Sequence, residues 1–242
     1  SDSESKASPP TIALLIPAFN EEDVIAHVIE EVRAACELPI FVIDDASTDK
    51  TVMRAENSGA SIIPLPTQLG AWGAMQTGLR YALRNGFDMV ITMDADGQHE
   101  AESIQDLIAP VLKGEADVAI GACTDRGSRL RQIAWILMKR TSGLRLEDIT
   151  SGFRVYNRRS MRILASWRAT LLDYQDIGVL LLLQSKDMNI IDIKVPMQPR
   201  RNGASRVFHS WLMIVYYMSQ TLLLGFSKRS IARSYDAPRA AS

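Results

Sequence analysis

Cysteine and histidine, the residues behind disulfide scaffolds and many metal sites, are scarce in this chain. Its 242 residues include two cysteines and three histidines. Cys36 and Cys123 have neither metal-binding nor redox spacing, which favours a reducing compartment. The histidines His27, His99 and His209 lack the spacing of metal ligands. Since the chain is 47% hydrophobic and 23% charged, it can bury one large core without such staples.

Long apolar runs are missing as well. The most apolar stretch, Trp211–Phe226, is interrupted by the polar residues 219–221 and is shorter than the ~20 residues that a membrane-spanning helix needs. We interpret residues 207–227 as either a core helix or an amphipathic helix at a membrane interface. Residues 1–10 are polar and contain no apolar h-region, so we expect a disordered lead-in without a signal peptide. Residues 228–242 are expected to form a disordered tail.

Net charge is also small, at −1, but it is unevenly distributed. Residues 1–117 carry 7 basic and 20 acidic residues, whereas residues 118–242 carry 20 basic and 8 acidic residues. The near-zero total and the lack of a nucleic-acid motif argue against a nucleic-acid partner. The pattern favours a protein whose basic half faces something else that is anionic.

Apolar strand-like runs alternate with helix-like segments along the first half of the chain. This alternation predicts an α/β fold with a mostly parallel, Rossmann-like sheet and helices on both faces. The expected strands are Ile12–Ile16, Ile40–Asp44, Ile62–Leu65, Met89–Asp94, Val118–Gly121, Gly152–Tyr156 and Ile190–Val195. The expected helices are Glu21–Ala35, Asp49–Ser58, Gly70–Asn85, Ala101–Lys113 and Ile177–Gln184.

An acidic motif, Asp94-Ala95-Asp96-Gly97-Gln98, follows one of the expected strands. Ligands of open α/β sheets bind at the carboxyl ends of the strands. Alternation along an extended segment puts Asp94 and Asp96 on one side, where they can share a divalent cation. Because Mg²⁺ is usually held by one or two carboxylates plus substrate phosphates, the motif favours a metal-bridged diphosphate. The alternative is a solvated acidic turn.

Further polar motifs follow other strands, and their order along the chain resembles that of a known family. The motifs are Pro17–Glu22, Asp44–Asp49, Asp94–Gln98, Asp148–Arg154 and Arg200–Arg206. Together they closely resemble the inverting family 2 glycosyltransferases, which have the GT-A fold. The nearest match is the branch that makes dolichyl- or polyprenyl-phosphate sugars. The resemblance covers residues 11–206, which are expected to form the GT-A domain.

The resemblance implies a role for residues of each motif. The nucleotide pocket would be lined by Pro17, Phe19, Asn20, Glu21 and Asp44. Mg²⁺ or Mn²⁺ would be held on the diphosphate by Asp94, Asp96 and Gln98, with Asp96 also catalytic. The phosphates would be contacted by Arg200, Ser205 and Arg206, with Arg200 catalytic, and the acceptor by Arg129 and Arg131. The alternative role of Asp44 and of the neighbouring Asp45 is helix N-capping.

This chain departs from the family pattern at two positions. The family often has a Gly-Lys-Gly-like segment where this chain has Gly70-Ala71-Trp72-Gly73, so a lysine contact would be lost there. Lys194 stands where an acid usually precedes the Val-Pro pair.

The expected reaction moves a sugar from a nucleotide-sugar donor, of the GDP-mannose or UDP-hexose type, to polyprenyl or dolichyl phosphate. The acceptor oxygen is already anionic, so no strong general base is required. Arginines are needed instead to hold two phosphate-bearing substrates together, and residues 126–145 supply six basic residues and no acid. Such an enzyme would act as a peripheral protein on the cytoplasmic face of a membrane.

Two other functions remain open at this stage. The same fold could transfer to a glycan or another hydroxyl, with Asp176 as the general base, although Asp176 could equally cap the helix that follows it. A third function is that of a non-catalytic module that binds a nucleotide sugar. The sequence does not identify the sugar or the nucleotide base, and it leaves assembly into a homo-oligomer open.

Overall fold

A seven-stranded sheet forms the centre of the protein. The computed structural model describes residues 9–97, 101–122, 151–170 and 177–196. These residues belong to one compact unit, Ser1–Thr124 with Glu147–Asn202. The strand order is β3-β2-β1-β4-β6-β5-β7. The strands are β1 (Ile12–Ala18), β2 (Ile40–Asp44), β3 (Ser61–Pro64), β4 (Met89–Thr92), β5 (Val118–Ala122), β6 (Arg154–Asn157) and β7 (Ile190–Lys194).

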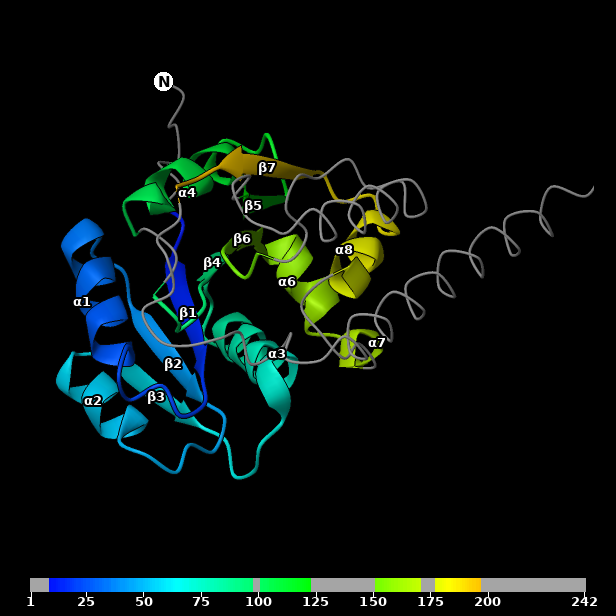
Figure 1. The fold of residues 1–242 in the computed structure, drawn as a ribbon. Coiled ribbons are helices and arrows are strands. Elements are labelled where there is room, and N and C mark those ends of the chain that lie inside the picture. Colours follow the sequence, from blue (N-terminus) through cyan, green and yellow to red (C-terminus); the bar gives the residue numbers. More distant parts are fainter. Residues whose placement is uncertain (1–8, 98–100, 123–150, 171–176, 197–242) are drawn as a thin grey trace, which may run out of the picture. The chain divides into compact units, whose positions relative to one another are not determined.

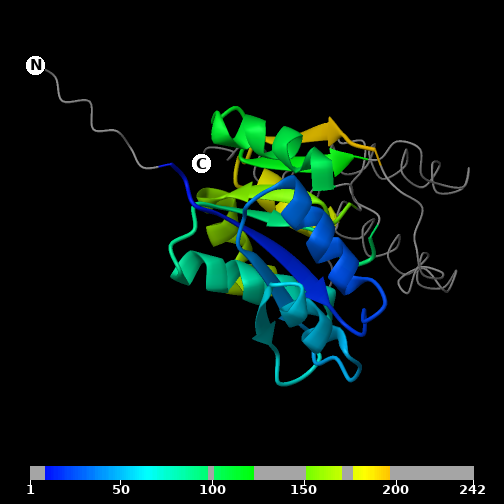
Figure 2. The ribbon, with the colours of Figure 1, turned by 90° about the vertical axis from the view of Figure 1, so that its left-hand side faces the viewer.

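All strands but one run in the same direction. The β1 strand pairs in parallel with β2 and β4, and β5 pairs in parallel with β7. The exception is β6, which lies antiparallel between β4 and β5, so that Arg154 at its start is opposite Thr92 at the end of β4. In Figure 2 the dark blue β1 and the orange β7 point toward the same side of the molecule. The carboxyl ends of the parallel strands and the amino end of β6 therefore meet at one edge.

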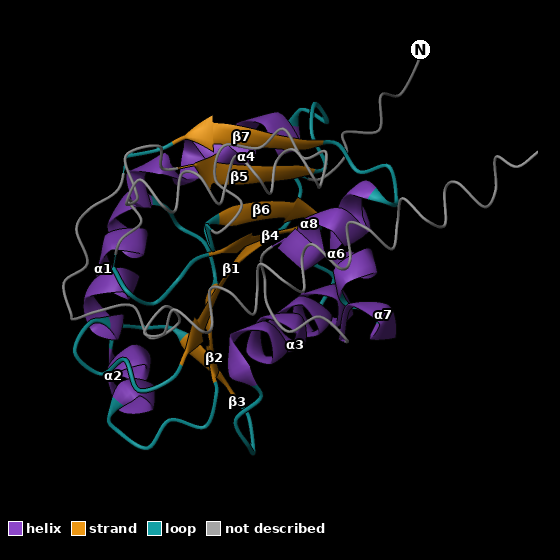
Figure 3. Cartoon of the chain, turned by 45° about the vertical axis from the view of Figure 1, so that its right-hand side comes forward, coloured by secondary structure: helices purple, strands orange, loops and turns teal. Residues whose placement is uncertain are grey.

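Helices cover both faces of this sheet, as Figures 1 and 3 show. One face carries α1, α2 and α4, and the other carries α3, α6 and α8. The helices of the first face are α1 (Ile25–Ala35), α2 (Thr51–Asn57) and α4 (Ile104–Leu112), which follows the short 3₁₀ helix η1 (Ala101–Ser103). Those of the second face are α3 (Gly70–Arg84), α6 (Arg158–Leu164) and α8 (Ile177–Gln184), with the short α7 (Trp167–Thr170) after α6.

Each face is sealed by a different kind of packing. Apolar side chains of α1 and α4, among them Val28, Ile29 and Leu107, are fully buried against the sheet. On the other face, α3 comes close to β1 and β2 at Gly78, where an added Cβ would lie 2.9 Å from Cδ1 of Ile43. Burial of this much apolar surface stabilises the sheet from both sides. The polar motifs lie at the ends of the strands instead.

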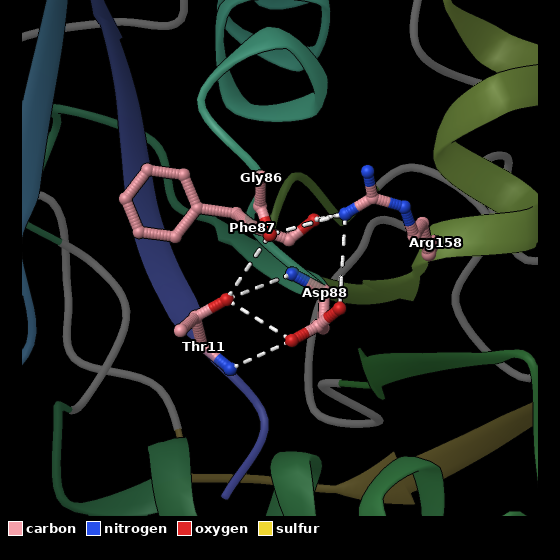
Figure 4. Close-up of polar contacts among 5 residues, drawn as sticks. All are labelled: Thr11, Gly86, Phe87, Asp88 and Arg158. Atoms are coloured by element: carbon pink, nitrogen blue, oxygen red, sulfur yellow. Dashed lines mark hydrogen bonds and ion pairs between the residues drawn. The ribbon is translucent and has the colours of Figure 1, made fainter. Parts of the chain in front are cut away.

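Polar contacts tie the amino ends of β1 and β4 to α6 (Figure 4). The backbone N–H and the hydroxyl of Thr11 each donate to Oδ2 of Asp88 at 3.0 Å. The guanidinium of Arg158 donates to the carbonyl of Phe87 at 2.8 Å and lies 3.7 Å from Oδ1 of Asp88. Hydrogen bonds from Thr11, first the backbone N–H and then the hydroxyl, lower the pKa of Asp88, and the charge of Arg158 adds to them. This cluster lies at the end of the strands opposite to the motif-bearing edge.

The expected α/β fold with a mostly parallel sheet and helices on both faces is thus confirmed, and several details differ. The reversed direction of β6 was not predicted. The sequence interpretation also assigned no element to residues 158–170, which form α6 and α7. The side chain of Asn157 accepts the N–H of Ser160 at 2.9 Å, so α6 begins directly where β6 ends and leaves no loop to be recognised. The expected first helix was too long, because Glu21–Val24 form a turn before α1.

Candidate active site

Hydrogen bonds join the loop after β1, at Asn20, to the loop after β2, at Ser47 and Thr48, and the two loops form one platform. The backbone N–H of Asn20 donates to Oγ of Ser47 at 3.0 Å, and Oδ1 of Asn20 accepts the N–H of Thr48 at 2.8 Å. Asn20 and Ala46 both have left-handed backbones, with φ values of 53° and 61°. Left-handed alanine is disfavoured by sterics and persists only where the surroundings impose it, which is common at binding sites. The platform is therefore held in a specific shape.

The predicted nucleotide-pocket residues lie at this platform. Pro17, Phe19, Asn20 and Glu21 are half-buried at the carboxyl end of β1. Asp44 ends the neighbouring β2, is 5% exposed, and accepts the N–H of Ser47 at 3.2 Å. A carboxylate offers about four acceptor sites, so this one contact leaves capacity for a hydroxyl or a base N–H. The structure thus brings all five predicted residues together.

Asp45 has a structural role that the sequence interpretation left open. Its carboxylate is 3% exposed and accepts the N–H groups of Leu69 at 2.6 Å and Gly70 at 2.9 Å. Asp45 is therefore not the N-cap of the helix that follows it, which is Lys50, and it instead accepts N–H groups at the start of α3, from the N-cap Leu69 and from Gly70. A protein carboxylate thus satisfies two of the N–H groups at the start of α3.

Trp72, which stands in the family's Gly-Lys-Gly-like segment, belongs to the core. It is 4% exposed, and its indole N–H donates to the carbonyl of Ala169 on α7 at 2.8 Å. Trp72 therefore joins α3 to α7, and its side chain does not take the place of the lysine.

A second set of contacts fixes the acidic residues after Asn20. The N–H of Glu21 donates to Oγ1 of Thr51 at 2.8 Å, and the carboxylate of Glu22 accepts the N–H of Lys50 at 3.1 Å. Burial raises the pKa of Asp49, but hydrogen bonds from the Thr51 hydroxyl and from backbone N–H groups outweigh it and leave the pKa below its ordinary value. Asp49 therefore remains ionised at neutral pH and serves the loop structure.

Asp94 and Asp96 lie beyond the end of β4, next to β1. The strand ends at Thr92, two residues before the expected Asp94, and Asp96 lies in a turn. Strand alternation therefore does not place the side chains of Asp94 and Asp96 on one side. Burial nevertheless alternates, since both aspartates are half-buried while Ala95 and Gly97 are buried. Both carboxylates stand at the edge that carries the nucleotide-pocket residues.

The residues present fit a divalent cation shared with a diphosphate. Gly152 packs against Asp94 with no room between them, because an added Cβ would lie 2.5 Å from Cγ of Asp94 and still closer to both oxygens. This packing holds a carboxylate at the sheet edge, and two carboxylates are the usual protein share of a Mg²⁺ site that substrate phosphates complete. In the described part of the chain, no three His, Cys, Asp or Glu side chains are grouped as a metal site. A site here would thus depend on the substrate and on Gln98, which lies outside the described residues.

Several other predicted residues also lie outside the described parts of the chain. They are Asp176, which was the candidate general base, Arg129, Arg131, Arg200, Ser205 and Arg206. The expected segments 207–227 and 228–242 lie there too. In the residues that are described, no helix has the length and hydropathy to cross a membrane.

The sequence predicted no role for Arg154, the last residue of the Asp148–Arg154 motif. Arg154 proves to be completely buried, and its Nε donates to the carbonyl of Ser151 at 2.7 Å. The signal that was available is chemical, since a charged arginine in an otherwise apolar strand such as Phe153–Tyr156 requires buried partners.

Comparison with known proteins agrees with the fold and the motifs. Residues 13–167 match the family described as glycosyl transferase family 2. The chain is 30% identical over 167 residues to an undecaprenyl-phosphate mannosyltransferase of Micrococcus luteus, a match that covers 62% of this chain and 68% of the relative. It is also 30% identical over 162 residues to a polyprenol monophosphomannose synthase of Mycolicibacterium smegmatis, covering 60% of this chain and 61% of that protein. The second match thus spans less than two thirds of the relative.

Solved structures show the same fold at lower sequence identity. A glucosyl-3-phosphoglycerate synthase from Mycobacterium tuberculosis, in complex with Mn²⁺, UDP and phosphoglyceric acid, superimposes with a TM-score of 0.68 at 22% identity. The similarity covers 91% of this chain and 78% of that one. This likeness confirms the expected GT-A fold, and the match over residues 13–167 shows that the chain belongs to glycosyl transferase family 2.

Proposed function

We propose that this protein is a metal-dependent inverting glycosyltransferase that moves a sugar from a nucleotide-sugar donor to a polyprenyl phosphate. The observation that carries the proposal is the meeting of three strand ends at one edge. There, Asp44 of β2 and the Asn20 platform of β1 lie beside Asp94 and Asp96 after β4. The family match and the names of the relatives from Micrococcus luteus and Mycolicibacterium smegmatis support the reaction and the acceptor.

On the donor side, the platform would bind the nucleoside. Asp44 would accept hydrogen bonds from the ribose or the base, as an acceptor-only carboxylate can. Pro17, Phe19 and Glu21 would line the same pocket. Since the platform is already held by contacts between the two loops, it would bind the donor without first having to order itself.

At the diphosphate, Asp94 and Asp96 would hold Mg²⁺ or Mn²⁺ together with Gln98. The cation would supply charge neutralisation for the leaving nucleoside diphosphate. Both aspartates are half-buried after the end of β4, and the crystallised neighbour from Mycobacterium tuberculosis was solved with Mn²⁺ and UDP. Loss of either carboxylate is therefore expected to affect the reaction more than the fold.

On the acceptor side, an anionic phosphate oxygen would attack the anomeric carbon from the face opposite to the leaving group and invert it. This oxygen needs no strong base. Arg200, with Arg206 and Ser205, would hold the reacting phosphates, while Arg129 and Arg131 would hold the acceptor. An acceptor of this kind is a lipid, so we also propose that the protein works at the cytoplasmic face of a membrane.

Nucleotide release is the measurement that tests the proposal. Purified protein would be incubated with GDP-mannose or UDP-hexoses and Mn²⁺, with and without undecaprenyl phosphate. We expect release that depends on the lipid phosphate and disappears in excess EDTA. Release that depends on a hydroxyl acceptor and is lost in Asp176→Asn would support the alternative acceptor. Donor binding with no release under any of these conditions would indicate a binding module.

A further inference from the structure

Three hydrogen bonds hold the main chain of Ser151–Phe153, the segment that precedes β6. The hydroxyl of Thr92 donates to the carbonyl of Gly152 at 2.7 Å, in a buried position on β4. The N–H of Gly121 on β5 donates to the carbonyl of Phe153 at 2.8 Å. Nε of the fully buried Arg154 donates to the carbonyl of Ser151 at 2.7 Å. Because β6 runs antiparallel to its neighbours, this segment lies at the edge where β4 ends.

Gly152 is the member of this segment that touches Asp94. The three heavy atoms nearest to a Cβ built on Gly152 are the two oxygens and Cγ of the Asp94 carboxylate. The backbone of Gly152 is not in the left-handed region, so a side chain would meet no conformational strain there. The obstacle to a side chain at this position is therefore the carboxylate of Asp94.

We propose that Gly152 is a positioning residue, which sets where the Asp94 carboxylate stands at the end of β4 and so sets the affinity for the divalent cation. This inference rests on the metal dependence in the proposed function. The main chain around Gly152 is held by hydrogen bonds from Thr92, Gly121 and Arg154, whereas the atoms that a Cβ would meet are those at the end of the short Asp94 side chain. A methyl group at residue 152 would consequently displace the carboxylate and leave the sheet in place.

Arg154 and Thr92 support this role by holding the segment itself. The guanidinium of Arg154 also donates to the hydroxyl of Tyr156 at 3.3 Å, so the arginine joins the start of β6 to the loop before it. Thr92 is the last residue of β4 and lies two residues before Asp94, so its bond to Gly152 links the positioning residue directly to the end of the strand that Asp94 follows. Partners that orient a ligand in this way usually change metal affinity by about 10- to 100-fold when they are altered.

The test measures cation binding directly. Free Mn²⁺ would be followed by its EPR signal during titration of the full chain in the presence of UDP and, separately, GDP. We expect Gly152→Ala to weaken Mn²⁺ binding by about tenfold or more. In transfer assays its apparent KM for Mn²⁺ should rise while kcat at saturating Mn²⁺ recovers. A loss of stability alone would not produce that split.

Two further variants separate positioning from folding. Gly78→Ala inserts a methyl group against Ile43 and Leu15, which do not belong to the segment before β6, and should lower the urea midpoint without changing Mn²⁺ affinity. Thr92→Val keeps the shape of the side chain but removes the hydroxyl that holds Gly152. It should weaken Mn²⁺ binding by a few-fold, and it tests the proposal even where Gly152→Ala does not fold.

The outcomes separate the positioning role of Gly152 from the metal dependence in the proposed function. Tight Mn²⁺ binding by the unaltered protein together with equal binding by Gly152→Ala, or by Thr92→Val where only that variant folds, would overturn the positioning role alone. If the unaltered protein binds no Mn²⁺ with either nucleotide, the metal dependence in the proposed function is wrong, and the positioning role is wrong with it.

Discussion

Two adjacent carboxylates in this protein have different roles, and the surrounding sequence does not show which residue has which role. Asp44 and Asp45 are adjacent, both are almost fully buried, and yet Asp45 accepts N–H groups at the start of α3 while Asp44 faces the loop at Ser47. The motif alone left capping and substrate binding open for both residues. Which of the two reaches the helix is decided by where Leu69 and Gly70 return to the sheet, a contact 24 residues away along the chain from Asp45 to Leu69.

At the residue scale, Asp96 is expected to be needed for transfer and not for folding. Asp96→Asn keeps the shape of the side chain and removes the charge that would face a cation. We expect kcat to fall by a factor on the order of 100 or more, in line with the loss of one group that stabilises developing charge. Nucleotide release and the far-UV circular dichroism spectrum would be measured side by side.

The matched control is Asp106→Asn, an exposed acid in the first turn of α4. This variant should retain full activity, and excess chelator should reduce the unaltered protein to the level of Asp96→Asn. Undiminished transfer in excess chelator would contradict the assignment of Asp96 to a metal.

At the element scale, the contact of Asp45 should determine the stability of α3. Asp45→Ala leaves the N–H groups of Leu69 and Gly70 without their acceptor, and loss of a side-chain acceptor at a helix start costs about 0.5–2 kcal/mol of unfolding free energy. Asp45→Asn keeps one acceptor oxygen and should lose less. Urea denaturation of the three proteins gives the comparison, and an unchanged midpoint in Asp45→Ala would show that water replaces the carboxylate.

The contact between β1 and β4 should give stability that depends on pH. The pKa of Asp88 is lowered in the folded state, so its contribution is present in full above the unfolded pKa of about 4 and is lost as the pH falls through the folded pKa. Asp88→Asn should therefore be less stable than the unaltered protein at pH 7, by at most about 1 kcal/mol because the half-exposed carboxylate is screened by water. The difference should narrow as the pH falls below about 4.

Denaturant midpoints across this pH range measure the effect. Thr11→Val provides the complementary test, because it removes the hydroxyl that donates to Asp88 and keeps the backbone N–H (Figure 4). In that variant the pKa of Asp88, followed by NMR, should rise toward its ordinary value. A stability difference between Asp88→Asn and the unaltered protein that stays constant down to pH 3 would contradict the assignment.

The elements themselves were predictable where one local pattern decides them. Apolar runs such as those of β1 and β4 are bounded by polar turns, so their existence could be predicted from periodicity. The direction of β6 could not, because strand direction depends on which neighbour it pairs with, here β4 and β5. The start of α6 could not be predicted either, because its cap, Asn157, is also the last residue of β6 and no loop separates the two elements.

At the scale of the whole molecule, the location of the candidate site was predictable from the order of the motifs. Parallel strands bring their carboxyl ends to one edge, and Asn20, Asp44 and Asp94 follow strands that are neighbours in the order β2-β1-β4. Gly152 lies at the same edge because it precedes β6, which runs antiparallel to β4. That is why its contact with Asp94 could not be predicted from spacing along the chain.

Membrane attachment remains a prediction that belongs to the whole chain. Residues 200–242 carry seven basic residues and one acidic residue around an apolar stretch that includes Trp211, Tyr216, Tyr217 and Phe226. Aromatic residues flanked by cations are typical of segments that bind anionic membrane surfaces, where each nearby Lys or Arg adds about 1 kcal/mol. We expect the full chain to sediment with phosphatidylglycerol vesicles at low salt and to be largely released at high salt.

Two variants identify the segment and separate its charges from its apolar residues. A chain that ends at residue 206 should stay in the supernatant at any salt concentration, while a Lys228→Gln, Arg229→Gln, Arg233→Gln variant should bind more weakly and with less dependence on salt. If the full chain fails to bind vesicles at low salt, peripheral attachment is wrong. The proposed acceptor would then be a soluble hydroxyl compound instead of a lipid phosphate, with Asp176 as the general base.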